Sequence, residues 1–355
     1  MKKVITSILV LIVISVFVIA SCTAPAPAPT PAPTPVPALV KPIELKFSHH
    51  DPPDGPGGRS TAIYAKKIEE ATGGKVKITM YPSAQLAQGP AQYDAVINGI
   101  TDIGWSTHGF YPGRFPLSNL ILQPYLGIKN ATMGSTIFWN MYKTFPEVQA
   151  EYKDTKVLML STHQGAPIGT NMPIKTLEEL KGKKIRSIAG GALHWLSAAG
   201  ASPIAMPPGQ IYESMEKGVI DGWTIDFIGA EGFKLAEVTK YYLLPYWYVS
   251  GFWICMNKKS WDSLPPDVQK AIDSVSGDAA VVPIFAKTWD EGDQESIKRQ
   301  GIKPEQFNTL SAADVAQAAK IAEGVWAKEI ADVSAKGAPA QKVFDWLQKA
   351  VKDYK

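Results

Sequence analysis

The residue best suited to bind a small anion in this chain is an arginine in a short strand-like segment. Residues 183–188 (KKIRSI) read as a strand bounded by glycines, with Arg186 near its C-terminal end. Ligands of open α/β sheets gather at the C-terminal ends of the strands. A guanidinium there fits a carboxylate through two parallel hydrogen bonds, because it is planar and permanently charged. The alternative is a surface arginine that pairs with a nearby glutamate.

Further polar and aromatic side chains follow other predicted strands, where the wall of a ligand cleft is expected. His49 and His50 follow the first strand, and either one could donate a hydrogen bond to a ligand or cap the loop. Asp226 could orient Arg186, bind a ligand hydroxyl or cap a helix. An aromatic ring such as Trp105 buries a large area in a core or against a ligand. The candidate ligand-binding residues are Arg186, Asp226, Trp223, Trp105, Thr107, His108, His50 and Tyr111.

The sequence gives little support for catalysis or for a bound cofactor. Its 5 histidines show no HExxH or comparable metal-ligand spacing, and it contains no glycine-rich phosphate loop. Cys255 lies in an apolar stretch without a group that would activate its thiol. A metal site on the run from His49 to Asp51 is the remaining alternative. We therefore expect a binding protein, not an enzyme, without a metal or cofactor.

The composition is that of a globular protein with enough apolar mass for two cores. The chain has 355 residues, of which 45% are hydrophobic and 19% are charged. Its formal charge of +3 falls to about +1 if Lys2 and Lys3 are removed with a leader. A nearly neutral body gives no electrostatic basis for binding nucleic acid.

Residues 1–21 are predicted to be a lipoprotein signal peptide. Two lysines precede an apolar run that is short for a membrane-spanning helix. Residues 19–22 (IASC) resemble a bacterial lipobox, in which Cys22 becomes the lipid-modified N-terminus; cleavage at an ordinary signal-peptidase site is the alternative. Residues 22–42 then form a lipid-anchored Ala/Pro linker, because proline favours an extended chain. We expect an extracytoplasmic protein held at the cell membrane by this anchor.

The rest of the chain alternates strands and helices and contains a weak internal repeat. Residues 98–105 and 217–223 each combine a helix end, a capping glycine and a short strand that enters a loop. Asp102 and Asp221 in these segments are interpreted as structural turn residues. The repeat indicates two similar lobes with a ligand cleft between them, although unrelated helix ends could produce it. Helices are predicted over residues 60–71, 312–334 and 340–354, and a long helical run over residues 267–299 with only mild interruptions at Gly277 and Pro283.

Five stretches of sequence, taken in order, resemble one protein family. They are residues 71–76 (ATGGKV), 177–186 (LEELKGKKIR), 200–207 (GASPIAMP), 212–222 (YESMEKGVIDG) and 257–265 (NKKSWDSLP). From about Ile43 to Leu310 the chain resembles the extracytoplasmic solute receptors of tripartite ATP-independent periplasmic (TRAP) transporters, of the dicarboxylate-receptor type.

The resemblance implies an α/β, two-lobed clamshell similar to type II periplasmic binding proteins, with a long helix from Asp267 that spans both lobes. It implies lobe I from residues 43–162 plus 252–292, and lobe II from residues 163–251 plus 293–355. It implies that Arg186 corresponds to the arginine that binds the ligand carboxylate in this family. The expected function is to close on a small organic carboxylate and deliver it to the TRAP permease subunits in the membrane. A ligand-sensing lipoprotein and a lipoprotein enzyme using the same cleft are the alternatives.

Three departures from the family pattern bear on the ligand. Pro167 stands near the position of a second basic residue, and Pro208 replaces an aromatic wall residue. Residues 223–227 (WTIDF) replace a more polar patch. One cation with aromatic and apolar partners favours a monocarboxylate with an aromatic or apolar body over a dicarboxylate or a sugar acid.

Overall fold

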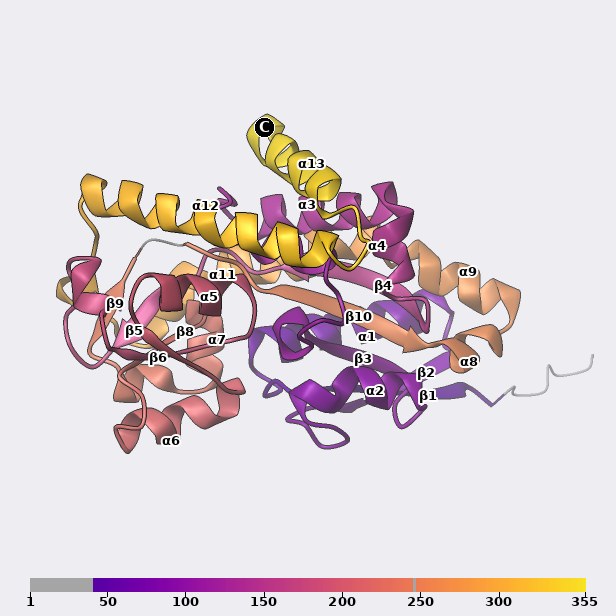
Figure 1. Ribbon diagram of the computed structural model, residues 1–355. Coiled ribbons are helices and arrows are strands. Elements are labelled where there is room, and N and C mark those ends of the chain that lie inside the picture. The colour runs from indigo at the N-terminus through magenta and orange to yellow at the C-terminus, as the bar shows by residue number, and fades with distance from the viewer. Residues whose placement is uncertain (1–40, 245–246) are drawn as a thin grey trace, which may run out of the picture. The chain divides into compact units, whose positions relative to one another are not determined.

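Two mixed β-sheets organise the chain, as the computed structural model in Figure 1 shows. The structure describes residues 41–244 and 247–355. The predicted signal peptide, Cys22 and nearly all of the Ala/Pro linker lie outside the described residues. Residues 41–355 cluster as a single compact unit.

The first sheet has five strands in the order β2-β1-β3-β10-β4. Strand β1 pairs in parallel with β2 and β3, whereas β10 runs antiparallel to β3 and β4. The alternating apolar residues of β1 explain its place, because one face of the strand is buried in the core. The strands are β1 (Ile43–His49), β2 (Val76–Tyr81), β3 (Ile103–Thr107), β4 (Thr155–Thr162) and β10 (Gly251–Asn257).

The second sheet has six strands in the order β11-β9-β5-β8-β6-β7. Strand β6 lies parallel to β7 and β8 and carries Arg186 opposite Ile204 and Trp223. The strand predicted over residues 183–188 is confirmed to within one residue at each end. The strands are β5 (Ile168–Thr170), β6 (Lys184–Ser187), β7 (Ser202–Ala205), β8 (Gly222–Thr224), β9 (Tyr241–Leu243) and β11 (Phe307–Asn308).

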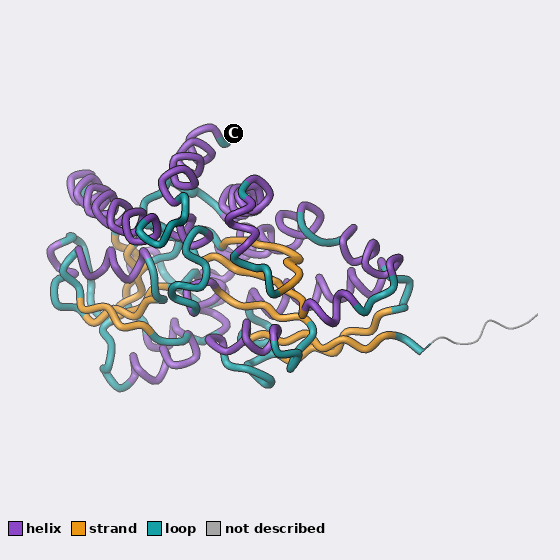
Figure 2. The backbone as a smooth tube through the Cα atoms, turned by 45° about the vertical axis from the view of Figure 1, so that its right-hand side comes forward, coloured by secondary structure: helices purple, strands orange, loops and turns teal. Residues whose placement is uncertain are grey.

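Helices pack against both sheets, and Figure 2 shows the strands gathered in two groups among them. We call the parts built on the two sheets the first and second lobes. The helices are α1 (Pro56–Ala71), α2 (Gln92–Ile97), α3 (Ala131–Thr144), α4 (Pro146–Ala150), α5 (Gly191–Ala198), α6 (Ile211–Glu216), α7 (Phe227–Gly232), α8 (Lys258–Asp262), α9 (Pro266–Ser274), α10 (Asp278–Ala280), α11 (Lys287–Arg299), α12 (Ala312–Ser334) and α13 (Ala340–Asp353).

Two of the segments that carry the chain between the lobes are paired. One lies between β4 and β5 and the other between β9 and β10, and the two are hydrogen-bonded to each other. The Ser250 N–H donates to His163 Nε2 at 3.0 Å, and the Ala166 N–H donates to the Tyr248 carbonyl at 3.1 Å. These paired segments are the natural place for a hinge, whereas the predicted residue boundaries of the lobes stay a prediction.

The long helix that joins the two lobes is α12, not the predicted helix from Asp267. The N-terminal part of α12 packs Ala318 and Ala322 into the core of the second lobe. Its C-terminal part packs Ile330 into a core of the first lobe, and Figure 1 shows α12 running along both sheets.

The helix predicted over residues 267–299 is wrong as a single element. It is broken into α9, α10, a π-helix (Val281–Ala286) and α11. The break falls at Gly277, whose φ is +55° and whose Cβ would lie 2.6 Å from the Trp139 ring. Only glycine fits there, and its conformation ends the helix.

Helix α1 begins at Pro56, four residues before the predicted start. The glycines that resemble a loop in the sequence are helical residues in a crowded place. A Cβ on Gly58 would lie 2.2 Å from the Pro52 carbonyl oxygen, and one on Gly57 would lie 2.5 Å from the Trp105 ring. Their lack of a side chain therefore serves close packing.

The internal repeat is present in the structure. Gly99 and Gly218 both end a helix with positive φ, +72° and +66°. Asp102 and Asp221 each accept a backbone N–H from the neighbouring strand, from Lys46 and from Lys184, at 2.8 Å. The structural interpretation of the two aspartates is confirmed.

Candidate functional site

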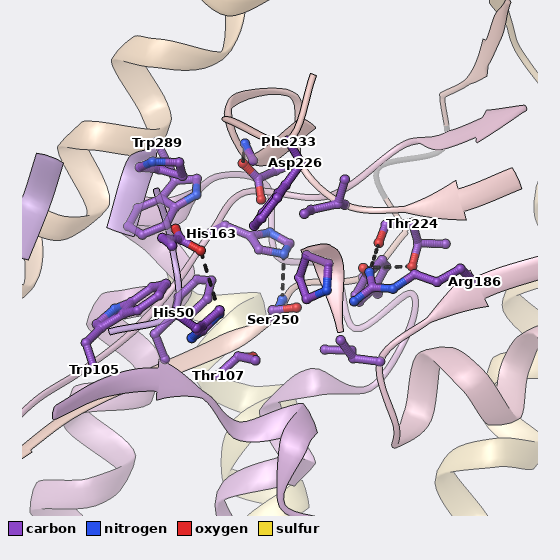
Figure 3. A pocket seen from close by; sticks show the side chains of 18 residues that line it. His50, Trp105, Thr107, His163, Arg186, Thr224, Asp226, Phe233, Ser250 and Trp289 are labelled. Atoms are coloured by element: carbon purple, nitrogen blue, oxygen red, sulfur yellow. Dashed lines mark hydrogen bonds and ion pairs between the residues drawn. The ribbon is translucent and has the colours of Figure 1, made fainter. Parts of the chain in front are cut away.

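A cavity lies where residues of the two lobes meet. The first lobe contributes residues that end or follow β1 and β3, together with β10 and α11. The second lobe contributes residues of β6 and residues that follow β8. The labelled lining residues in Figure 3 are His50, Trp105, Thr107, His163, Arg186, Thr224, Asp226, Phe233, Ser250 and Trp289.

Arg186 holds its guanidinium at one side of this cavity with two backbone contacts. Its Nε donates to the Met206 carbonyl at 2.9 Å, and its Nη1 donates to the Thr224 carbonyl at 2.9 Å. A guanidinium has five N–H donors, so about three remain. Nη2 is buried without a hydrogen-bond partner among the described residues.

The Arg186 charge is buried and has no anionic partner in the described part of the chain. The residue is 1% exposed, and none of the ion pairs of the structure includes it. Burial lowers the pKa of Arg186 from 12.5 to about 10, which the Tyr248 hydroxyl partly opposes. The group remains a cation at neutral pH, and no other Arg or Lys lines the cavity within the described residues.

Aromatic rings from four segments form a continuous stack at the other side. His50 stacks on Trp105, Trp105 on Phe252, and Phe252 on Trp289, each with centroids 5.0 Å apart. Both faces of Trp105 and Phe252 are therefore covered by neighbouring rings. We conclude that these two rings present their edges to the cavity, the geometry that favours an edge-to-face contact with a further ring.

Two carboxyl groups and two histidines complete the polar lining. Burial raises the pKa of Asp51 from 3.8 to about 7, partly opposed by the Gly57 N–H, which donates to Asp51 Oδ2 at 3.0 Å. Asp226 caps α7 by accepting the Gly229 N–H at 2.8 Å. Burial lowers the pKa of His50 to about 3. Figure 3 shows the Asp226 side chain well separated from Arg186.

His163 is neutral because both of its ring nitrogens are engaged. Its Nε2 accepts the Ser250 N–H at 3.0 Å, and its Nδ1 lies in contact with the Gln164 carbonyl, to which it donates. Burial lowers the pKa of this histidine. His163 therefore fixes the geometry of the paired crossing segments and offers no proton to the cavity.

The structure brings five of the eight predicted site residues to the cavity lining: Arg186, Asp226, Trp105, Thr107 and His50. The other three lie in the protein interior, where each has at least one polar side-chain atom hydrogen-bonded. Trp223 donates from Nε1 to Thr239 Oγ1 at 2.8 Å. His108 is bonded through Nε2 to the Tyr152 hydroxyl at 2.6 Å, and Tyr111 donates to the Gly89 carbonyl at 2.6 Å.

Several lining residues were missed in the sequence. Asp51 directly follows His49 and His50, so its position in the same loop was enough to predict that it lines the cavity. Phe252 lies in the apolar stretch around Cys255 and Trp289 in the helical run predicted over residues 267–299, and only the fold brings them beside Trp105. Cys255, on the same strand as Phe252, is buried, and burial raises the pKa of its thiol to about 12.

Within residues 41–244 and 247–355 there is no group of three or more His, Cys, Asp or Glu side chains arranged to hold a metal ion. In the same part of the chain, no helix is both long enough and apolar enough to cross a membrane.

Residues 47–332 match the DctP family, the bacterial extracellular solute-binding proteins of family 7. The chain belongs to this family. Its members are receptors rather than enzymes, and the two-lobed α/β fold is the one expected from the sequence.

Three similar proteins illustrate the range of this family. The C4-dicarboxylate-binding periplasmic protein DctP of Rhodobacter capsulatus is 26% identical over 285 residues, 78% of this chain and 83% of that protein. A TRAP solute-binding protein of Rhodoferax ferrireducens, solved with copurified benzoate, has a TM-score of 0.81 and 27% identity, and covers 87% of this chain and 98% of its own. A marine metagenome TRAP protein specific for aromatic acids, solved with 3-hydroxybenzoate, has a TM-score of 0.83 and 26% identity, and covers 89% of this chain and 100% of its own.

Membership of the DctP family agrees with the geometry of the cavity. The protein is an extracytoplasmic TRAP solute-binding receptor for small carboxylates. The comparisons span both dicarboxylates and aromatic acids, so the ligand class has to be argued from the lining residues.

Proposed function

We propose that this receptor binds an aromatic monocarboxylate between its two lobes, with the carboxylate on Arg186 and the ring against the aromatic stack. The observation that carries the proposal is the Arg186 cation, which is 1% exposed and has no counter-ion among the described residues. A buried charge is costly unless it is paired. A ligand carboxylate would supply the missing charge and accept from Nη1 and Nη2 in the bidentate arrangement that suits this pair.

A single carboxylate is favoured because the cavity has a single basic residue. A dicarboxylate would bury a second negative charge near Asp226 and Asp51, without a cation to receive it. The lining also includes the apolar residues Ile188, Pro208 and Phe233, in addition to the aromatic stack. The benzoate and 3-hydroxybenzoate bound by two related proteins support the same ligand class.

The ring is needed for affinity. A micromolar complex requires about 8 kcal/mol of binding free energy. Two charge-assisted hydrogen bonds contribute about 3–6 kcal/mol, at about 1.5–3 kcal/mol each, so the carboxylate alone falls short. Burial of the ligand ring against the edges of Trp105 and Phe252 would supply much of the rest.

Closure of the lobes would couple binding to transport. Arg186 and Asp226 belong to the second lobe and the aromatic stack to the first, so a ligand that contacts both would favour the closed arrangement. The paired segments at His163 and Ser250 would then act as the hinge. The closed receptor would deliver its ligand to TRAP permease subunits in the membrane.

Attachment of the receptor to the cell membrane through a lipid on Cys22 is part of the same proposal. The supporting observation is the lipobox-like sequence before this residue. Labelling with a radioactive fatty acid should mark the wild-type protein and leave the Cys22→Ser variant unmarked.

The ligand class can be tested by calorimetric titration of ligand-free protein. A panel of benzoate, phenylacetate, succinate and glucuronate separates the aromatic, dicarboxylate and sugar-acid classes. We expect an aromatic monocarboxylate to bind at least 100-fold more tightly than succinate or glucuronate. Tighter binding of succinate or glucuronate would refute the proposal.

A further inference from the structure

The cavity has a second polar feature beside Arg186, formed by two carboxyl groups. Asp226 is 3% exposed and Asp51 is 5% exposed, and both line the cavity. Each uses one oxygen to accept a backbone N–H at the start of a helix, Gly229 for Asp226 and Gly57 for Asp51. Asp226 Oδ2 and Asp51 Oδ1 accept no hydrogen bond from any described residue.

Three polar groups that line the cavity with these two free oxygens do not supply the missing donor. His163 has both ring nitrogens engaged. His50 Nε2 lies 3.6 Å from Asp51 Oδ1, too long for a hydrogen bond, and burial keeps this ring neutral by lowering its pKa to about 3. Tyr248 already donates its hydroxyl to Thr224 Oγ1 at 2.9 Å.

Asp293, on α11, is a further acidic group close enough to Asp226 to interact with it electrostatically. Burial together with the Asp226 charge raises the pKa of Asp293 from 3.8 to about 7, partly opposed by the Gln164 side chain. Arg186 directs its hydrogen bonds to Met206 and Thr224 and lies apart from Asp226 (Figure 3). Trp105 and Trp289 have indole N–H groups without a partner, but no described residue donates a hydrogen bond to Asp226 Oδ2 or Asp51 Oδ1 in this arrangement.

We propose that the ligand carries a hydrogen-bond donor, a hydroxyl or an ammonium group, that reaches Asp226 and Asp51 while its carboxylate binds Arg186. The inference rests on the proposed function, because it takes Arg186 as the carboxylate site. An aromatic acid without a donor would bury these oxygens unsatisfied. A site built to hydrogen-bond a ligand group rejects the analogue that lacks that group.

The test is a calorimetric comparison of matched benzoates. The series comprises benzoate, the three ring-position isomers of hydroxybenzoate, their methyl ethers, and the three aminomethylbenzoates, which carry an ammonium group. We expect at least one hydroxyl or ammonium compound to bind 10-fold or more tightly than benzoate, and every methyl ether to lose that gain. The preference between hydroxyl and ammonium compounds identifies the donor.

Two variants test whether the higher affinity for donor-bearing ligands depends on Asp226 and Asp51. Asn caps a helix as well as Asp does, so Asp226→Asn keeps the bond to Gly229 but presents an amide in place of the free oxygen. The same change at Asp51 provides a second variant, and thermal unfolding verifies that both are folded. In at least one variant the donor-bearing ligand should lose at least 10-fold more affinity than benzoate does.

Two results would overturn the inference and leave the proposed function standing. One is benzoate binding wild-type protein as tightly as every donor-bearing analogue. The other is an equal loss of benzoate and of the donor-bearing ligand in both variants. If no aromatic acid binds and succinate or glucuronate does, the inference and the proposed function both fail.

Discussion

Replacement of Arg186 by methionine should remove most of the affinity for a carboxylate. About three of the five N–H donors of this guanidinium are free, because Met206 and Thr224 accept only two. Two charge-assisted hydrogen bonds to a ligand are worth about 3–6 kcal/mol, at about 1.5–3 kcal/mol each. Their loss corresponds to a dissociation constant at least ~100-fold higher.

The Arg186→Met variant should remain folded, because two effects on stability oppose each other. Burial lowers the pKa of Arg186 from 12.5 to about 10, a difference worth roughly 3 kcal/mol against the buried charge. The variant is relieved of this cost. It also loses two hydrogen bonds from a charged donor, worth about 1.5–3 kcal/mol each. These effects cancel to within about 3 kcal/mol, so the change in ligand affinity can be measured on native protein.

The assay is isothermal titration calorimetry of both proteins with benzoate or a tighter aromatic acid, with thermal unfolding in parallel. Arg114→Gln is the matched control, because Arg114 is partly exposed and pairs with Asp94 at 2.9 Å, away from the cavity lining. The control should keep the wild-type affinity and the wild-type thermal shift. An Arg186→Met protein that binds the ligand as tightly as wild type would refute the assignment of the carboxylate site.

Three further predictions follow from the lining of the cavity. Gly57→Ala should weaken ligand binding measurably, because the added Cβ would lie 2.5 Å from the Trp105 ring. The control is Gly324→Ala, in an open position on α12. It should raise the free energy of unfolding by about 0.5–1 kcal/mol and leave binding unchanged. The Asp51 pKa is raised from 3.8 to about 7, so folded protein keeps a proton that unfolded chain has lost, and stability should fall as pH rises from 4 to 7. Asp51→Asn should reduce that fall by up to roughly 4 kcal/mol in chemical denaturation, and equal pH profiles of the two proteins would contradict this. Phe252→Leu should lower benzoate affinity roughly 2- to 10-fold and cyclohexanecarboxylate affinity less; an equal loss of both would exclude an aromatic contact.

The sequence predicted features that depend on the order of residues within a short segment. The alternation of residues 183–188 places Arg186 at the end of a buried strand, and β6 has these bounds to within one residue. The repeated glycine caps and aspartates indicated two similar lobes, and Gly99 and Gly218 have the conformation that such caps require.

Long-range packing explains what the sequence could not give. Trp105, Phe252 and Trp289 become one stack only when β3, β10 and α11 meet. The helical run predicted over residues 267–299 is broken at Gly277 and not just mildly interrupted, because Gly277 adopts a φ of +55° where it packs against Trp139, far away in the sequence. Trp223 was placed in the cleft from its loop, whereas its ring packs in the core and its indole bonds to Thr239.

We propose that a buried guanidinium and a stack of rings select an aromatic monocarboxylate. Mass spectrometry can identify the small molecules released on denaturing receptor purified from its native host. We expect an aromatic acid with one carboxylate, present in wild-type protein and missing from the Arg186→Met variant. A dicarboxylate or a sugar acid released from the wild-type protein would contradict it.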